Sequence, residues 1–266
     1  MTQALNDAAS GPGPSPGRRI PRILTIAGSD SSGGAGIQAD IKTITVLGGY
    51  AMSAITAITA QNTLGVSAVE VLSPELVAAQ IDACLSDIGV DAIKIGMLGS
   101  SAIAAVVAER IAALAVPVVF DPVMVATSGA ALADPATIAA FERLMQLATL
   151  TTPNVAELAA LGGHEGMTAR GVAYLAKGGD SEVERIEDVL VIPGEAPLVM
   201  AGTRIHTRHT HGTGCTLSSA IATYLAKGLP LAEAVDRARL FVRSALRAAP
   251  GFGQGNGPLG HAEARG

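Results

Sequence analysis

A glycine-rich segment, His211-Gly212-Thr213-Gly214-Cys215, directly precedes an apolar helical pattern. Small residues ahead of a helix leave backbone N–H groups pointing outward, and the helix dipole favours negative charge there. Gly212, Thr213 and Gly214 could therefore hold a phosphoryl group in transfer. We expect the helix start to lower the pKa of the Cys215 thiol, so that it serves as a thiolate or proton acceptor. The alternative is an inert Cys215 and a capping Thr213.

A second glycine-rich segment, GSDSSGGAG, covers residues 28–36. It lacks the lysine of a phosphate-binding P-loop, because Gly34 follows Gly33. Residues 34–39 match a dinucleotide fingerprint weakly, since no acidic residue follows at the expected distance. A third interpretation is a loop that lets a small planar substrate lie against backbone, with Asp40 pointing toward it. The alternative is a plain helix start with a solvated Asp40.

Carboxylate, amide and ammonium groups recur farther along the chain. Asn154 and Glu157 are spaced to share the first turn of a helix, where their oxygens suit Mg²⁺, although a helix-capping box has the same spacing. Asp121 either stabilises its loop or belongs to a metal and phosphate environment. Lys177, beside two glycines, could bind an anionic ligand or be a solvated turn residue.

Three histidines, His206, His209 and His211, lie close together in the sequence. Zinc usually takes four ligands, and the H-x-x-H-x-H spacing of these histidines supplies three at most. We therefore interpret these histidines as loop residues rather than as a metal site.

The elements that must position these residues alternate along the chain. Ligands of parallel sheets bind outside the carboxyl ends of the strands, which is where the motifs occur. The alternation predicts a mostly parallel sheet with helices on both faces. The apolar runs that precede the motifs, and that we expect to be strands, cover residues 23–27, 92–95, 118–120, 149–151 and 172–176. The expected helices cover residues 36–47, 74–88, 102–113, 134–147, 214–226 and 231–248.

Composition excludes several classes of protein. The chain has 266 residues, 49% hydrophobic and 15% charged, which excludes a wholly disordered protein. The net charge of −5 is the opposite of the basic excess that is typical of nucleic-acid-binding proteins. Two cysteines are too few for a disulfide scaffold and favour a reducing cytosol. The mean hydropathy is +0.42, but glycines and amides interrupt the long uncharged stretch at 43–69, which we interpret as buried helix plus strand and not as a membrane span.

Taken in order, the motifs resemble the hydroxymethylpyrimidine/phosphomethylpyrimidine kinase family of thiamine synthesis. The segments that carry the resemblance read AGSDSSGGAGIQAD, AITAQNT, KIGML, FDPVM, TPN-x-x-E, KGG and THGTGCT. The resemblance implies a ribokinase-like, three-layer α/β/α fold over residues 22–258. The N-terminal run GPGPSPGRR lacks the apolar core of a signal peptide, so we expect a disordered tail at 1–21, and we expect a C-terminal tail at 259–266. The resemblance also implies ATP and Mg²⁺ as cofactors and a homodimer.

Residue roles follow from the same resemblance. Gly28, Asp40 and Gln61 would hold the pyrimidine, while Met97 and Val123 would pack against its ring. The segment 212–215 would form an anion hole, with Cys215 placed where sugar kinases of this fold carry a catalytic aspartate. The remaining residues would serve the nucleotide and the metal, namely Lys177, Asn154 and Asp121 for nucleotide phosphates, and Glu157 with Asp121 for Mg²⁺.

One segment departs from the family pattern. Residues 158–176 are about a dozen residues shorter than the helix and strand that the family places there, so we expect a shortened or missing helix on the nucleotide side. The leading function is phosphorylation of the pyrimidine alcohol and of its monophosphate. The alternatives are a pyridoxine or pyridoxal kinase of the same fold, and a pyrimidine-binding protein with impaired ATP chemistry. The missing ribose-binding acid disfavours a dinucleotide-dependent oxidoreductase.

Overall fold

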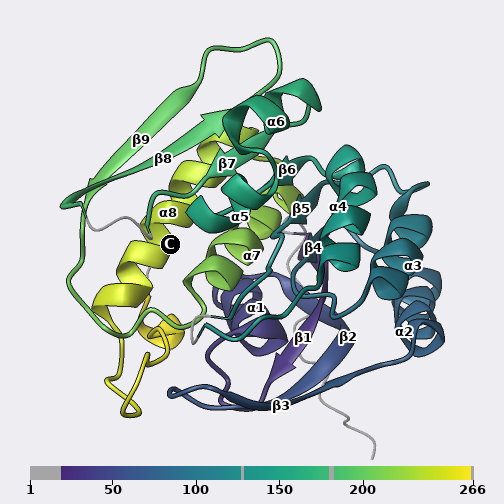
Figure 1. Cartoon of the computed structure of the whole chain (residues 1–266), viewed down its shortest axis with the longest axis horizontal. Coiled ribbons are helices and arrows are strands. Elements are labelled where there is room, and N and C mark those ends of the chain that lie inside the picture. The colour runs from purple at the N-terminus through teal and green to yellow at the C-terminus, as the bar shows by residue number, and fades with distance from the viewer. Residues whose placement is uncertain (1–18, 127–128, 180–182, 265–266) are drawn as a thin grey trace, which may run out of the picture.

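The computed structural model describes residues 19–126, 129–179 and 183–264. The strands are β1 (Arg22–Asp30), β2 (Tyr50–Gln61), β3 (Val66–Val71), β4 (Ala92–Ile95), β5 (Val118–Phe120), β6 (Leu150–Thr151), β7 (Tyr174–Ala176), β8 (Arg185–Val191) and β9 (Leu198–Thr203). Within the described ranges they form one nine-stranded sheet in the order β3-β2-β1-β4-β5-β6-β7-β8-β9. The six central strands run parallel, and β3, β8 and β9 are antiparallel to their neighbours. Figure 1 shows β3 and β9 at opposite ends of the sheet.

Helices cover both faces of this sheet (Figure 1). They are α1 (Gly36–Val46), α2 (Pro74–Asp87), α3 (Ser101–Ile111), α4 (Pro135–Leu147), α5 (Val155–Ala160), α6 (Gly163–Ala169), α7 (Thr213–Ala226) and α8 (Leu231–Arg247). Successive strand residues point to opposite faces. In β1, Leu24 and Ile26 join a core with α2 to α6, whereas Ile23 joins a core with α1, α7 and α8. The predicted three-layer fold with a mostly parallel sheet is therefore confirmed.

Local sequence explains where the helices begin. Ser73 caps α2 by accepting a hydrogen bond from the Leu76 amide, and Pro74 occupies the first turn, as predicted. Asp134 caps α4 in the same way through the Thr137 amide. The expected helix boundaries agree with the structure to within two residues.

Two antiparallel hairpins were not anticipated. The uncharged stretch at 43–69 contains the end of α1, all of β2 and part of β3, and β3 is largely exposed rather than buried. At the other end of the sheet, charged residues such as Arg185, Glu187 and Asp188 obscure the strand pattern of β8, which pairs with β9. Among the described residues, no helix combines the length and apolar character needed to cross a membrane.

The packed domain extends past the expected boundary at residue 258. A short 3-10 turn, η1 (His261–Glu263), packs against α1 and α8. Leu259, His261 and Ala264 are buried there, so this segment belongs to the domain and not to a tail. Residues 1–18 of the expected N-terminal tail lie outside the described residues. Pro21 is already buried, and its carbonyl accepts a hydrogen bond from the Tyr50 amide.

Candidate active site

The predicted site residues follow the carboxyl ends of the parallel strands. Gln61 ends β2, Met97 follows β4, Asp121 follows β5 and Lys177 follows β7. The N-terminus of α7 reaches the same edge, because Gly214 lies beside Asp121 and Lys177. The sheet topology thus brings together residues that are far apart in the sequence, as expected for ligand sites in such sheets.

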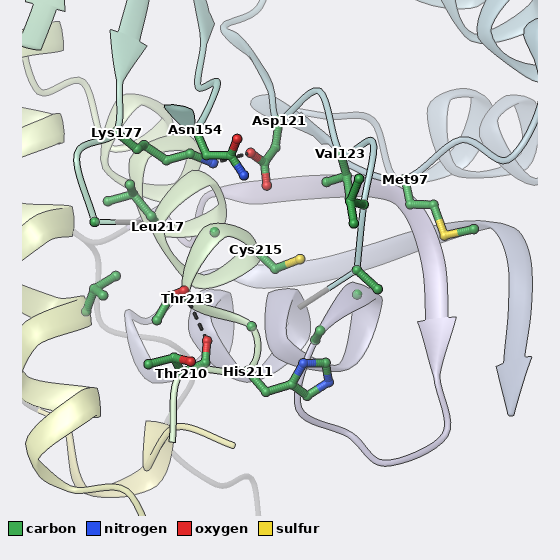
Figure 2. A pocket seen from close by; sticks show the side chains of 18 of the residues that line it. Met97, Asp121, Val123, Asn154, Lys177, Thr210, His211, Thr213, Cys215 and Leu217 are labelled. Atoms are coloured by element: carbon green, nitrogen blue, oxygen red, sulfur yellow. Dashed lines mark hydrogen bonds and ion pairs between the residues drawn. The ribbon is translucent and has the colours of Figure 1, made fainter. Parts of the chain in front are cut away.

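These residues surround one cavity of about 710 Å³. Figure 2 shows Asp121, Asn154 and Lys177 gathered at one end, Met97 and Val123 toward the other, and Cys215 between them. Of the predicted site residues, the cavity wall contains Gly28, Gln61, Met97, Asp121, Val123, Asn154, Glu157, Lys177, Gly212, Thr213, Gly214 and Cys215. Asp40 is the exception.

Asp30 organises the loop between β1 and α1. Its carboxylate accepts hydrogen bonds of 2.8, 3.0 and 2.8 Å from the backbone amides of Ser32, Gly34 and Ala35. Burial opposes ionisation, but hydrogen bonds from His211, Ser32 and Ala35 together lower the pKa of Asp30 to about 2. Asp30 is therefore anionic at neutral pH and holds the loop in one shape.

The loop that precedes α7 packs against this first loop. Gly212 has φ +89°, a conformation that favours glycine, and a Cβ at this position would collide with the carbonyl oxygen of Gly34. The Thr213 amide donates to the Thr210 carbonyl at 3.2 Å. The first amides of a helix have no acceptor within it, so Gly214 and Cys215 are left to present N–H groups to the cavity. The predicted anion hole thus has fewer free N–H donors than expected, because the Thr213 amide already donates to Thr210.

The prediction that the Cys215 thiol has a lowered pKa is wrong. Burial is the largest influence and raises the pKa of Cys215 to about 11. The negative charges of Asp40 and Asp121 act in the same direction, while Lys94 and the Gly36 amide oppose them only in part. The thiol is therefore neutral at pH 7, and Cys215 does not serve as a standing thiolate.

The prediction that Asp40 points toward the substrate is also wrong, and so is the solvated alternative. Asp40 is 0% exposed and absent from the cavity wall. Its carboxylate accepts hydrogen bonds from Thr25 Oγ1 at 2.5 Å, Ser219 Oγ at 2.6 Å and Lys94 Nζ at 2.9 Å. Asp40 thus joins β1, α1, β4 and α7 beneath the site, and its replacement will primarily affect stability.

A charge cluster occupies the end of the cavity beside α5. Lys177 Nζ lies 2.8 Å from Asp121 Oδ1 and 3.9 Å from Glu157 Oε2. Although burial opposes it, the lysines Lys177 and Lys94 hold the pKa of Asp121 below its usual range. Burial and the Asp121 charge instead raise the pKa of Glu157 to about 7, although Lys177 opposes this. A further cation beside Asp121 and Glu157 would therefore be electrostatically favourable.

Asn154 and Glu157 form the capping box that the sequence allowed as an alternative. The Glu157 amide donates to Asn154 Oδ1 at 2.8 Å, and the Asn154 amide donates to Glu157 Oε2 at 2.8 Å. Both residues also line the cavity. The structural and the ligand-binding interpretations are therefore compatible here.

The opposite end of the cavity suits a small flat ligand. Gly28 lies against Met97, because a Cβ on Gly28 would come within 3.0 Å of the Met97 sulfur. Gln61 and Val123 line the same region, and His211 lies next to Gln61. Such a combination is typical of a site in which apolar side chains pack against a ring and one amide fixes its orientation through hydrogen bonds.

Sequence reasoning missed several residues of this cavity. Asp30 and His211 stood in motifs that we singled out, yet we gave them no role. Lys94, within KIGML, was missed as well, although it lies outside the cavity wall, fully buried beside Asp40. A further part of the cavity wall, called the far wall here, was missed altogether, because it comes from β8, α8 and the loop after β9, where no motif was identified. Its residues are Ile186, Ile205, Arg239, Val242, Arg243 and Leu246. Only the amphipathic pattern of α8 hinted that one face would meet a neighbour.

Known proteins provide an independent comparison. Residues 30–260 match the family model described as phosphomethylpyrimidine kinase. A hydroxymethylpyrimidine/phosphomethylpyrimidine kinase from Rhizobium meliloti is 49% identical over 255 residues, which cover 90% of this chain and 96% of that protein. A phosphomethylpyrimidine kinase structure from Clostridium difficile superposes with a TM-score of 0.74 at 40% identity, covering 85% of this chain and 99% of that one.

A second fold relative binds a nucleotide. The ADP complex of Bacillus subtilis pyridoxal kinase superposes with a TM-score of 0.83 at 35% identity, covering 92% of this chain and 98% of that one. The sequence match spans nearly the whole packed domain, and the cavity contains the motifs that carried the resemblance. The chain therefore belongs to the phosphomethylpyrimidine kinase family and is a kinase.

Proposed function

We propose that this protein transfers the γ-phosphoryl group of ATP to the hydroxymethyl oxygen of 4-amino-5-hydroxymethyl-2-methylpyrimidine, and then phosphorylates the resulting monophosphate. The observation that carries the proposal is the single cavity that joins a ring-binding end at Gln61 and Met97 to a phosphate-binding end at Lys177, with the start of α7 between them. A cavity of this form can align two substrates in line for transfer.

The phosphate end fits a magnesium nucleotide. Asp121 and Glu157 offer carboxylate oxygens to either side of the Lys177 ammonium group, and burial together with the Asp121 charge raises the pKa of Glu157. Asp121 and Glu157 would hold Mg²⁺, which when bound neutralises phosphate charge. Lys177 and the side-chain NH₂ group of Asn154 would orient phosphate oxygens, and the apolar residues Val242 and Leu246 of α8 would receive the base.

Cys215 contributes to the transfer through its position more than through proton transfer. Phosphoryl transfer requires little covalent work from the protein, and positioning with charge stabilisation dominates. The backbone amides of Gly214 and Cys215 would donate to the migrating group, while the neutral thiol fills the space beside Gly36. Loss of one donor in such an anion hole typically costs about 10²–10³ in turnover.

The direct test is turnover of the purified protein with ATP, Mg²⁺ and the pyrimidine alcohol, followed by phosphorus NMR of the products. We expect a monophosphate and then a pyrophosphate. Calorimetry with a non-hydrolysable ATP analogue tests the alternative of a pyrimidine-binding protein. Pyrimidine binding without nucleotide binding would contradict the kinase proposal.

A pyridoxal kinase is the second candidate, because a pyridoxal kinase structure superposes on the chain with a TM-score of 0.83. Side-by-side turnover of pyridoxal and the pyrimidine alcohol separates the two. We expect the higher kcat/KM for the pyrimidine. Faster phosphorylation of pyridoxal would reverse the assignment.

We further propose that the protein is a cytoplasmic homodimer that binds neither nucleic acid nor membranes. The exposed apolar residues of the β2–β3 hairpin support the homodimer, since Ile58, Val69 and Val71 are 52%, 41% and 40% exposed. The acidic net charge of −5 argues against a nucleic-acid partner.

A further inference from the structure

His211, Gln61 and Asp30 form a hydrogen-bonded group at the ring-binding end of the cavity. The Gln61 side-chain amide lies 2.9 Å from Nε2 of His211, and Asp30 Oδ2 lies 2.8 Å from the same nitrogen. One ring nitrogen therefore faces two partners. The hydrogen on this nitrogen determines how both partners must be arranged.

The Asp30 carboxylate can only accept hydrogen bonds, because it is ionised and already receives three backbone amides. Nε2 of His211 must therefore carry a hydrogen, whether or not Nδ1 is also protonated. An N–H group of Gln61 cannot donate to a nitrogen that already bears hydrogen. The consistent arrangement turns the Gln61 oxygen toward His211, which its planar amide permits without a change of shape.

The histidine ring is held in place independently of any ligand. His211 is 5% exposed, and its backbone amide donates to the Gly257 carbonyl at 3.1 Å. The loop backbone at Gly34 lies so close to the ring edge that a Cβ there would collide with Cδ2. The ring cannot turn to offer a different nitrogen to Gln61.

We propose that His211, fixed by Asp30, is a positioning residue that turns the Gln61 amide so that its NH₂ group donates to the substrate. The inference rests on the proposed pyrimidine kinase function and deepens it. The site then selects a heteroaromatic ring that presents an unprotonated nitrogen to Gln61. A ring that carries N–H at this point meets a donor and is disfavoured.

A double-mutant cycle on the full-length protein tests whether His211 acts on substrate binding through Gln61. The dissociation constant of the pyrimidine alcohol is measured by calorimetry for wild type, His211→Phe, Gln61→Ala and the double variant. His211→Phe keeps a planar ring but removes Nε2–H, and we expect it to weaken binding about ten-fold or more. Because His211 acts through Gln61, the same change in the Gln61→Ala background should alter the constant less than two-fold.

The control is His261→Phe, which removes a histidine of similar burial, 4% exposed, whose Nε2 is bonded to Thr216 outside the cavity. It should leave pyrimidine binding within two-fold of wild type. Binding of the non-hydrolysable ATP analogue should also stay within two-fold in His211→Phe. Additive losses in the cycle, or an equal loss of nucleotide binding, would overturn the positioning role.

Substrate analogues test the direction of the hydrogen bond. Two analogues, each with one ring nitrogen replaced by C–H, are compared with the pyrimidine alcohol. Wild type should bind one of them about ten-fold or more weaker, and Gln61→Ala should not distinguish that analogue from the parent. Equal binding of all three by wild type would contradict donation from Gln61. Failure of wild type to phosphorylate the parent compound would instead refute the proposed function.

Discussion

Cys215 illustrates how a local motif and its surroundings can have opposite effects on one residue. A helix N-terminus ordinarily lowers the pKa of a thiol. Here burial and the carboxylates of Asp40 and Asp121 outweigh that influence and raise the pKa to about 11. The motif indicated the place of the residue correctly but not its ionisation, because the opposing charges come from other strands and helices.

Alkylation of Cys215 by iodoacetamide should therefore accelerate about ten-fold per pH unit between about pH 7 and pH 10, without reaching a plateau. Only the thiolate reacts, and its fraction grows toward the pKa of about 11. The measurement is mass spectrometry in a Cys84→Ala background, which removes the other cysteine. An alkylation rate that is already constant above about pH 7 would show that Cys215 is a thiolate at neutral pH and would contradict this prediction.

The raised pKa of Glu157 predicts a pH-dependent metal affinity. A carboxyl group is protonated below its pKa, and the proton competes with a metal ion. With a pKa of about 7, the apparent affinity for Mg²⁺ in the presence of an ATP analogue should fall about ten-fold per pH unit below pH 7 and level off above it. Titration calorimetry at several pH values measures this. Glu157→Gln, which can still accept the Asn154 amide, should bind Mg²⁺ weakly with no such slope, and a slope that persisted would point to another group.

At the scale of elements, the short connection between β6 and β7 retains the residues of the phosphate end. This connection contains two short helices, since α5 has 6 residues and α6 has 7, and the expected shortening relative to the family stays a prediction. Leu158 and Met167 still anchor both helices in the core formed with α2 to α4. Asn154 and Glu157 precede the segment with the expected shortening, so they keep their places in the cavity wall.

Gly163 connects these two helices in a conformation that favours glycine, with φ +67°. Gly163→Ala should lower the free energy of unfolding by about 1–2 kcal/mol, because a Cβ there meets open space and only the backbone strain remains. Chemical denaturation measures the change. Gly65→Ala is the matched control, since its Cβ also meets open space and its φ is not positive, and it should be neutral or slightly stabilising. Equal effects of both variants would contradict the strain argument.

At the scale of the whole molecule, the fold and the cavity differ in how far the sequence could predict them. The apolar runs of β1, β4 and β5 are buried on both faces, so their pattern and the motifs after them predicted the sheet and its edge. Gln61, Lys177 and Cys215 were therefore placed correctly in one cavity. Asp40 could not be, because its direction depends on Lys94 and Ser219, which only the tertiary structure brings beside it.

The proposed homodimer makes a prediction for the two edges of the sheet. Val69→Glu on β3 should convert the dimer to a monomer in sedimentation velocity, because it places a charge on the exposed apolar hairpin. Val199→Glu on β9, where the valine is 51% exposed, should leave the dimer intact. A wild-type monomer would refute the homodimer, and dissociation by Val199→Glu alone would move the interface to the other edge.

The hydrogen bonds of Asp40 also constrain how the enzyme can move. Its partners tie two neighbouring strands to the helices that begin at the reaction centre, with every charged group hidden from water. Breaking such a buried ion pair costs about 3–5 kcal/mol, a large share of the stability of a typical domain. We therefore expect β1, β4 and the N-terminal halves of α1 and α7 to keep their relative positions during the catalytic cycle. Entry of substrates and release of products then depend on the other segments that line the cavity.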